Sequence, residues 1–204
     1  MKLFYQTHSP YARKVLVAAH ELGLVTQLEV IHHETSPTTR NEIIYQANPL
    51  GKVPVLLLPD GIALFDSIVI CEYLDDLHAG HRLIPLQGAP RFEALRLQAL
   101  AQGMCDVGIK LRWEVERRPE ALRYPAYAEG QAYKLTEAYR FLENNIDLSG
   151  TITIGHVALA TALDWIAFRR LSDFSTYPRL MQWFQEFGER PSMRATEYCG
   201  QTHD

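Results

Sequence analysis

The order of short β-rich runs and helical patterns in the first 78 residues restricts this chain to few folds. Residues 2–5 and 28–31 are strand candidates, and residues 10–22 between them place apolar side chains along one side of a helix. Gly23 follows directly, at the position where a helix end favours a left-handed residue. A strand, a helix and a second strand in this order predict a parallel pair of strands.

Two more strand candidates follow at residues 53–58 and 62–64. They flank the turn signal Pro59-Asp60-Gly61, so they predict a hairpin. A helix or loop is expected before the third strand, and residues 66–77 predict a helix after the fourth. We therefore expect residues 1–78 to form an α/β domain of order βαβ-α-ββα, with helices packed on a mixed sheet.

The composition changes after residue 78. Small residues, glycine and proline at 79–87 predict a linker, and residues 88–204 show helical spacing throughout, which predicts an all-α domain. Amphipathic helices are predicted over residues 92–111, 126–146 and 177–187. Residues 154–168 carry a single charge, Asp164, and are apolar on every side, so this helix is predicted to be buried within the second domain.

Charge and cysteine content exclude several classes of protein. The net charge is −4 and no basic run is present, which argues against a nucleic-acid partner. No apolar run reaches membrane-spanning length, and the N-terminus lacks the apolar core of a secretion signal, so we expect a cytoplasmic protein with no membrane partner. Cys71, Cys105 and Cys199 form neither a CxxC pair nor a zinc cluster, which predicts reduced thiols and no metal.

Three motifs occur at the ends of predicted elements. They are SPYARKV at residues 9–15, NPLGKVPVL at residues 48–56 and FDSIVI at residues 65–70. In this order and spacing the chain resembles the glutathione S-transferase superfamily over nearly its whole length. The resemblance implies a thioredoxin-like N-terminal domain, an all-helical C-terminal domain, glutathione as co-substrate and a homodimer.

Ser9 is the predicted catalytic residue. Serine before proline suits the N-cap of a helix, and a hydroxyl there can donate a hydrogen bond to a thiolate that the helix dipole also favours. The resemblance implies that this residue activates the glutathione sulfur. Lowering a thiol pKa by roughly two units corresponds to about 2.7 kcal/mol, which a charge-assisted hydrogen bond and a helix terminus can supply. Tyr5 is the alternative activator.

The resemblance also implies a glutathione-binding set. Pro54 is expected to follow a cis peptide bond, so that Val53 presents its backbone N–H and C=O to the tripeptide like an added strand. Asp66 and Ser67 are expected to hold the γ-glutamyl end at a helix N-terminus. Lys52 is expected to meet the glycyl carboxylate.

Further residues are expected in the second domain and around the site. Asp106 is a candidate for reaching the glutathione of a partner subunit. Tyr11, Met104 and Trp113 are candidates for the second-substrate pocket in a cleft between the domains, although aromatic residues at helical spacing are usually core. The histidines, including the pair His32-His33, show no metal-ligand spacing and are expected in solvated loops.

One position departs from the pattern of the superfamily. The buried helix of that family typically begins with serine or threonine followed three residues later by aspartate, whereas this chain has Thr153 followed by His156. A neutral imidazole can accept a hydrogen bond from the cap backbone, but a protonated one opposes the helix dipole. We expect a cap that loses stability below about pH 6.

The function that these residues predict is glutathione transfer, in which bound glutathione thiolate attacks an apolar electrophile, a typical detoxification reaction. A glutathione-dependent isomerase or reductase is one alternative. A non-catalytic regulatory or scaffold protein with the same fold is the other. The sequence does not identify the second substrate.

Overall fold

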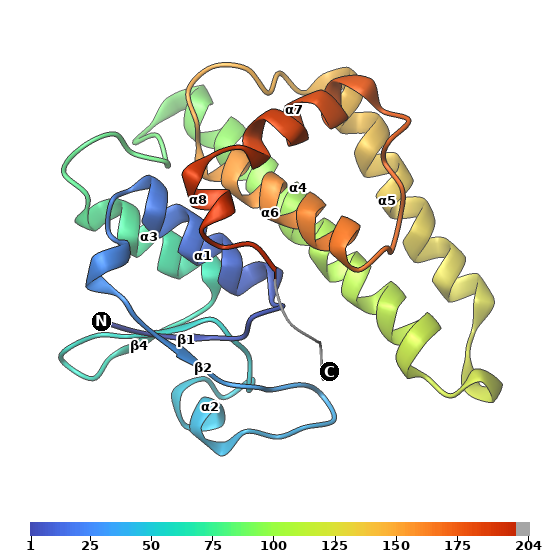
Figure 1. Cartoon of the computed structure of the whole chain (residues 1–204), viewed down its shortest axis with the longest axis horizontal. Helices are drawn as coiled ribbons and strands as arrows, with labels where there is room; N and C mark the ends of the chain where they lie inside the picture. Colours follow the sequence, from blue (N-terminus) through green and yellow to red (C-terminus); the bar gives the residue numbers. More distant parts are fainter. Residues whose placement is uncertain (199–204) are drawn as a thin grey trace. The chain divides into compact units, whose positions relative to one another are not determined.

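A four-stranded sheet of order β2-β1-β3-β4 lies at the centre of the N-terminal half of the computed structural model, which describes residues 1–198 (Figure 1). The strands are β1 (Lys2–Tyr5), β2 (Glu29–His32), β3 (Val55–Leu57) and β4 (Ala63–Leu64). β1 and β2 are parallel, while β3 is antiparallel to both β1 and β4. The predicted parallel pair and hairpin are confirmed.

Helices cover both faces of this sheet. They are α1 (Pro10–Glu21), α2 (Glu42–Ala47) and α3 (Ser67–Leu77), with a short 3-10 turn at Val25–Gln27. Figure 1 shows α1 and α3, which pack against each other, on one side of the sheet and α2 on the other. On the α2 side, Phe4 packs with Ile44 and Val55. α1 ends at Glu21, and Gly23, just past this end, has a φ of +68°, which confirms the predicted left-handed position.

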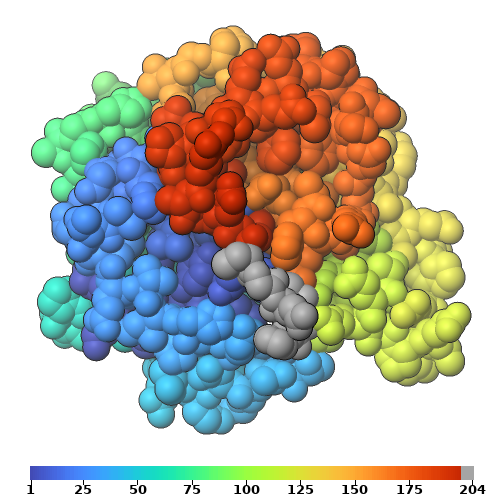
Figure 2. Space-filling model, in the orientation of Figure 1, coloured from blue at the N-terminus to red at the C-terminus, as the bar shows by residue number. Residues whose placement is uncertain are grey.

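The C-terminal segment returns to the first unit. The chain divides into residues 1–91 together with the segment from Pro191, and residues 92–190. Helix α8 (Pro191–Arg194) packs on α1, and Figure 2 shows this part of the chain against the blue N-terminal residues. The buried Arg13 donates from Nε to Thr196 Oγ1 and from Nη2 to the Met193 carbonyl, both at 3.2 Å. No pattern in the sequence predicts this return.

The second unit is helical. Its elements are α4 (Gly88–Arg112), a π-helical turn (Trp113–Arg117), a 3-10 turn (Glu120–Leu122), α5 (Pro125–Asn145), α6 (Ile154–Phe168) and α7 (Pro178–Gly188). α4 begins at Gly88, directly after the expected linker and before the predicted start at residue 92, because proline is tolerated in the first turn of a helix and Pro90 lies there. No helix in residues 1–198 is long and apolar enough to cross a membrane.

α6 is the buried helix that the sequence predicted. Nearly all of its side chains are buried, and it packs closely on α4 at Gly155. A Cβ at Gly155 would lie 2.7 Å from the Ala94 carbonyl oxygen and 2.8 Å from Leu97 Cβ. Glycine is therefore required where the two helices meet.

α6 begins with the expected capping interaction. The Thr153 N–H donates to His156 Nδ1 at 3.1 Å, so the imidazole takes the place of a carboxylate in the capping box. His156 Nε2 is buried and has no hydrogen-bond partner among the described residues. Burial lowers the pKa of His156, an effect that outweighs the raising influence of Asp147.

Candidate functional site

Ser9 is the N-cap of α1, as predicted. Its Oγ accepts a hydrogen bond from the Ala12 N–H at 3.2 Å, and Pro10 occupies the first helical position. A hydroxyl carries one proton to donate in addition to its acceptor lone pairs. The cap interaction uses an acceptor position only, so the Ser9 O–H remains available to an anion at this helix terminus.

Tyr5, the alternative activator, lies at the end of β1. Its side chain is 9% exposed, and its hydroxyl lies 3.5 Å from the Thr7 carbonyl oxygen. At this length the hydrogen bond is weak. Tyr5 is therefore mainly part of the packed interior, while Ser9 is only half-buried.

The Val53–Pro54 peptide bond is cis, which confirms the prediction. The preceding turn is built by Asn48, a buried residue whose Nδ2 donates to the Lys52 carbonyl at 2.9 Å and whose Oδ1 accepts from the Leu50 N–H at 3.0 Å. The asparagine and glycine of the NPLGKVPVL motif thus have a structural role that the sequence did not assign. They fix the backbone that enters the cis bond.

Gly51 in this turn has two reasons to be glycine. Its φ is +63°, a conformation that other residues adopt only with strain. A Cβ at this position would also lie 2.4 Å from ring atoms of Tyr45. The Tyr45 ring therefore takes the space beside the loop that leads to Val53.

Asp66 and Ser67 begin α3. Asp66 is the N-cap, and its Oδ1 accepts from the Ile68 N–H at 3.0 Å. Ser67 Oγ is fully buried and has no hydrogen-bond partner among the described residues. An unsatisfied buried hydroxyl costs about 1–3 kcal/mol. A ligand carboxylate at this helix N-terminus would satisfy it, so these residues fit the γ-glutamyl group expected there.

The sheet topology brings the three motifs to one edge. β1 and β3 are antiparallel with Phe4 opposite Val55, so the end of β1, which leads to Ser9, lies beside the start of β3, which follows Pro54. β4 is antiparallel to β3 with Leu64 opposite Leu56, so its exit toward Ser67 points to the same edge. Residues far apart in sequence therefore surround one place on the first unit.

The other predicted residues lie as follows. Lys52 is exposed and Tyr11 is half-buried in the first turn of α1. Met104, Asp106 and Trp113 belong to the second unit. Met104 is buried at 2% exposure, whereas Asp106 is exposed on α4 and Trp113 is half-buried at the π-helical turn. Their roles in substrate binding stay predictions.

His32 and His33 match their expected state in part: His32 is exposed but ends β2, and His33 lies in the loop that follows but is half-buried. His32 Nε2 lies 2.8 Å from Glu34 Oε1 and His32 Nδ1 lies 3.2 Å from Thr7 Oγ1, while the His33 ring packs edge-on against Phe4 at 4.7 Å. Both histidines are therefore held by neighbours. No spacing rule links His32 to Thr7, because the contact arises from the parallel pairing of β1 and β2.

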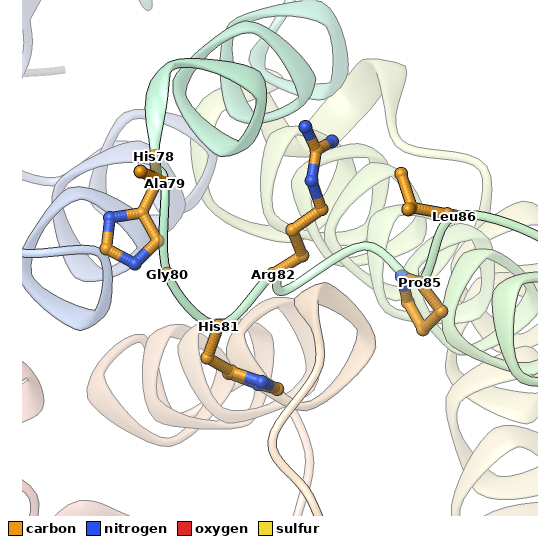
Figure 3. A pocket seen from close by; sticks show the side chains of 7 residues that line it. All are labelled: His78, Ala79, Gly80, His81, Arg82, Pro85 and Leu86. Atoms are coloured by element: carbon orange, nitrogen blue, oxygen red, sulfur yellow. The ribbon is translucent and has the colours of Figure 1, made fainter.

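A hollow of about 590 Å³ lies along the linker and is lined by His78, Ala79, Gly80, His81, Arg82, Pro85 and Leu86. Figure 3 shows Arg82 extending to the opposite side of the chain from His78 and His81. Arg82 pairs with Asp76 at 2.9 Å, and Asp75 accepts from the backbone N–H groups of Leu83 and Ile84. These contacts hold the linker in place, and none of the predicted site residues lines the hollow.

Comparison with known proteins agrees with this geometry. The family model described as glutathione S-transferase, N-terminal domain, matches residues 8–77. A glutathione transferase family member from Pseudomonas fluorescens Pf-5, solved with bound glutathione, is 35% identical, with a TM-score of 0.93 over 98% of this chain and 99% of that one. A glutathione S-transferase from Methylobacillus flagellatus, also solved with glutathione, is 32% identical, with a TM-score of 0.86 over 97% and 99%. The uncharacterized GST-like protein YibF of Escherichia coli is 28% identical over 203 residues, 97% of this chain and 98% of its own.

Fold and site together define a thioredoxin-like domain followed by a helical domain, the glutathione transferase fold. The chain belongs to the glutathione S-transferase superfamily, which confirms the resemblance seen in its sequence.

Proposed function

We propose that the protein is a glutathione transferase that holds glutathione at the edge of the sheet and activates its thiol through Ser9. The observation that carries this proposal is the cap geometry of Ser9, whose Oγ accepts from the Ala12 N–H and keeps its proton for a ligand. The glutathione-bound relative from Pseudomonas fluorescens, similar over 98% of this chain, supports the same ligand.

Glutathione binding divides among three positions of the first unit. Val53 offers its backbone to the cysteinyl residue in the manner of an added strand. Ser67 and the N-terminus of α3 receive the γ-glutamyl carboxylate, while Asp66 pairs with the ammonium group. Lys52 is exposed and meets the glycyl carboxylate.

The chemical step is nucleophilic substitution or addition by sulfur. A free thiol with a pKa of about 8.5 is only a few per cent ionised at neutral pH. The Ser9 hydroxyl donates to the thiolate, the α1 dipole favours the negative charge, and the thiol proton leaves to solvent. The thiolate electron pair then forms a bond to the electrophilic carbon, and a leaving group departs with its bonding pair where the substrate carries one.

A second substrate and a second subunit complete the proposal. Tyr11 and Trp113, both half-buried, supply apolar surface for an electrophile, whereas Met104, at 2% exposure, contributes as core of the second unit. Asp106, which is exposed on α4, reaches the glutathione of a partner subunit in a homodimer. Sedimentation of the protein with and without glutathione tests the dimer. We place the protein in the cytoplasm with a role in detoxification.

The cysteines argue against a reductase that forms mixed disulfides. Ser9, not cysteine, begins α1. Cys71 and Cys105 are both buried, and burial raises the pKa of Cys71 to about 11. Neither thiol has the exposure that thiol exchange requires, and Cys199 lies outside the described residues. A scaffold protein, another alternative, has no need of the unsatisfied Ser67 hydroxyl. An isomerase would use the same activated thiolate, and product analysis separates it from a transferase.

Calorimetric titration with glutathione tests the proposal on wild type, Ser9→Ala and Tyr5→Phe in parallel, together with the ultraviolet absorbance of bound thiolate. We expect all three proteins to bind and only Ser9→Ala to lose the thiolate signal, with a rise in thiol pKa of about two units. Loss of the signal in Tyr5→Phe alone would assign activation to Tyr5. No binding by wild type at millimolar glutathione would favour the scaffold alternative.

A further inference from the structure

Four polar side chains form a chain of hydrogen bonds beside the turn that leads to Ser9. Gln6 Nε2 donates to Glu34 Oε2 at 2.7 Å, Glu34 Oε1 lies 2.8 Å from His32 Nε2, and His32 Nδ1 lies 3.2 Å from Thr7 Oγ1. Gln6 and Thr7 are adjacent in sequence, so the chain closes into a ring. Glu34 is its centre, because each of its two oxygens leads to one residue of the turn.

This ring fixes the backbone on which Ser9 depends. The Ser9 N–H donates to the Gln6 carbonyl at 3.0 Å. The Gln6 side chain is bound to Glu34, and the Gln6 backbone in turn is bound to Ser9. Gln6 is buried and Thr7 half-buried, whereas Glu34 is largely exposed. An exposed carboxylate that contacts this turn directly through Gln6 and indirectly through His32 restricts the turn more than it stabilises the whole fold.

The backbone of Glu34 is also held in place by a hydrogen bond. Its carbonyl accepts from Asn41 Nδ2 at 2.9 Å, and Asn41 caps α2 through its Oδ1. The next residue, Thr35, donates from Oγ1 to the Gly51 carbonyl at 2.9 Å. Two adjacent residues therefore reach the two halves of the site: Glu34 reaches the Ser9 turn and Thr35 reaches the loop before Val53.

We propose that Glu34 is a positioning residue that orients the Ser9 turn for thiol activation through Gln6 and His32, while Thr35 separately orients the loop that binds the tripeptide backbone. The proposal rests on the glutathione function above. In this proposal Glu34 acts without contacting glutathione or its sulfur, so its effect passes through Ser9. Its removal should change the acidity of the bound thiol and leave the binding of the tripeptide unchanged.

The test measures two quantities on the full-length protein. The ionisation constant of bound glutathione comes from its ultraviolet thiolate absorbance across pH. The dissociation constant of S-methylglutathione, which has no thiol proton, comes from calorimetry. For Glu34→Ala we expect an ionisation constant lower by about three- to tenfold and S-methylglutathione binding within about twofold of wild type. Thr35→Val should show the reverse pattern.

Three further variants make the result specific. Glu34→Gln keeps an oxygen that can accept from Gln6, so it should recover part of the ionisation constant. Glu42→Ala is the matched control, because Glu42 is an exposed carboxylate of the same region that pairs with Arg40 only through its side chain. In the Ser9→Ala background, Glu34→Ala should have no further effect.

Two results overturn the proposal in distinguishable ways. If wild type forms bound thiolate and Glu34→Ala leaves its ionisation constant within twofold, or the effects of Glu34→Ala and Ser9→Ala add, positioning by Glu34 is wrong and the transferase function stands. If wild type forms no bound thiolate, both proposals are wrong, because Ser9 then has nothing to activate.

Discussion

Asn48 holds the carbonyl of Lys52 with its Nδ2 at 2.9 Å while its Oδ1 accepts from the Leu50 N–H. One buried side chain therefore closes the turn immediately before the cis Val53–Pro54 bond. The position of the Val53 backbone, which is proposed to bind glutathione, depends on the conformation of this turn. Stability and glutathione affinity are thus coupled at Asn48.

We expect Asn48→Ala to lower the free energy of unfolding by about 2–4 kcal/mol, because it leaves one donor and one acceptor of the turn unsatisfied. Glutathione affinity should fall as well. Asn144→Ala is the matched control, since the Asn144 amide also donates to a backbone carbonyl, that of Arg140, but on an exposed helix face. Urea unfolding and calorimetry measure the two effects, and equal loss in both variants would contradict the coupling.

Alanine substitutions at Gly51 and Gly61 should destabilise the protein to different extents. Gly51→Ala meets both a positive φ and the Tyr45 ring, so it should destabilise by more than about 2 kcal/mol. Gly61→Ala has φ of +90° but open space, so only the backbone term of about 1 kcal/mol applies. Adding Tyr45→Ala to Gly51→Ala should restore part of the difference. Thermal unfolding checks the order, and an unchanged double variant would show that the ring is not the obstacle.

The contacts of Arg13 indicate that the packing of the C-terminal segment on α1 contributes to the stability of the protein. Its guanidinium donates to Thr196 and to the Met193 carbonyl, and it lies 4.4 Å from the centre of the Tyr198 ring. Arg13→Met should cost about 2–4 kcal/mol, because a buried hydrogen-bonded group is lost and its acceptors remain. Arg123→Met, which removes an exposed hydrogen bond to the Arg118 carbonyl, should cost much less. Chemical denaturation compares the pair.

Sequence patterns predicted the elements well because each depends on local chemistry. The alternation of strands, the Asp66 cap and the apolar α6 are all encoded within a few residues of one another. The cis bond before Pro54 was predicted from the resemblance and is confirmed.

Long-range side-chain contacts could not be predicted in the same way. The contact of Thr7 with His32 requires the register of two paired strands, and that of Arg13 with Thr196 spans most of the chain. Residue spacing carries no signal for either. The unsatisfied Ser67 hydroxyl likewise follows from burial, which depends on the packed helices around it.

Substitution of Ser67 should affect the stability of the protein and its affinity for glutathione in different ways. Its Oγ is buried without a partner among residues 1–198, so Ser67→Ala removes an unsatisfied group and should leave the free energy of unfolding unchanged or raise it by about 1 kcal/mol. The same change should weaken glutathione binding about tenfold, which corresponds to one charge-assisted hydrogen bond. Calorimetry and thermal unfolding on the same samples check both signs. A destabilised Ser67→Ala with normal affinity would show that the hydroxyl serves the fold.

His156 predicts how stability depends on pH. Burial lowers its pKa in the folded chain, so between the ordinary value near 6.5 and the folded value the unfolded chain binds more protons. The free energy of unfolding therefore falls as pH drops below about 6.5, by at most about 1.4 kcal/mol per pH unit. Above that pH the imidazole is neutral in both states, and it accepts the Thr153 N–H in the folded chain.

Replacing this imidazole should remove the acid-sensitive part of the stability. His156→Asn keeps a neutral acceptor that does not titrate, and His156→Asp adds a charge that the α6 N-terminus favours. Both variants should gain stability relative to wild type between pH 7 and pH 5.5, by at most about 1 kcal/mol, with the larger total for aspartate. Urea unfolding across this range provides the comparison. If the free energy of unfolding of wild type falls no more steeply with decreasing pH than that of His156→Asn, the cap does not titrate. If His156→Asp is no more stable than wild type at pH 5.5, the carboxylate does not improve the cap.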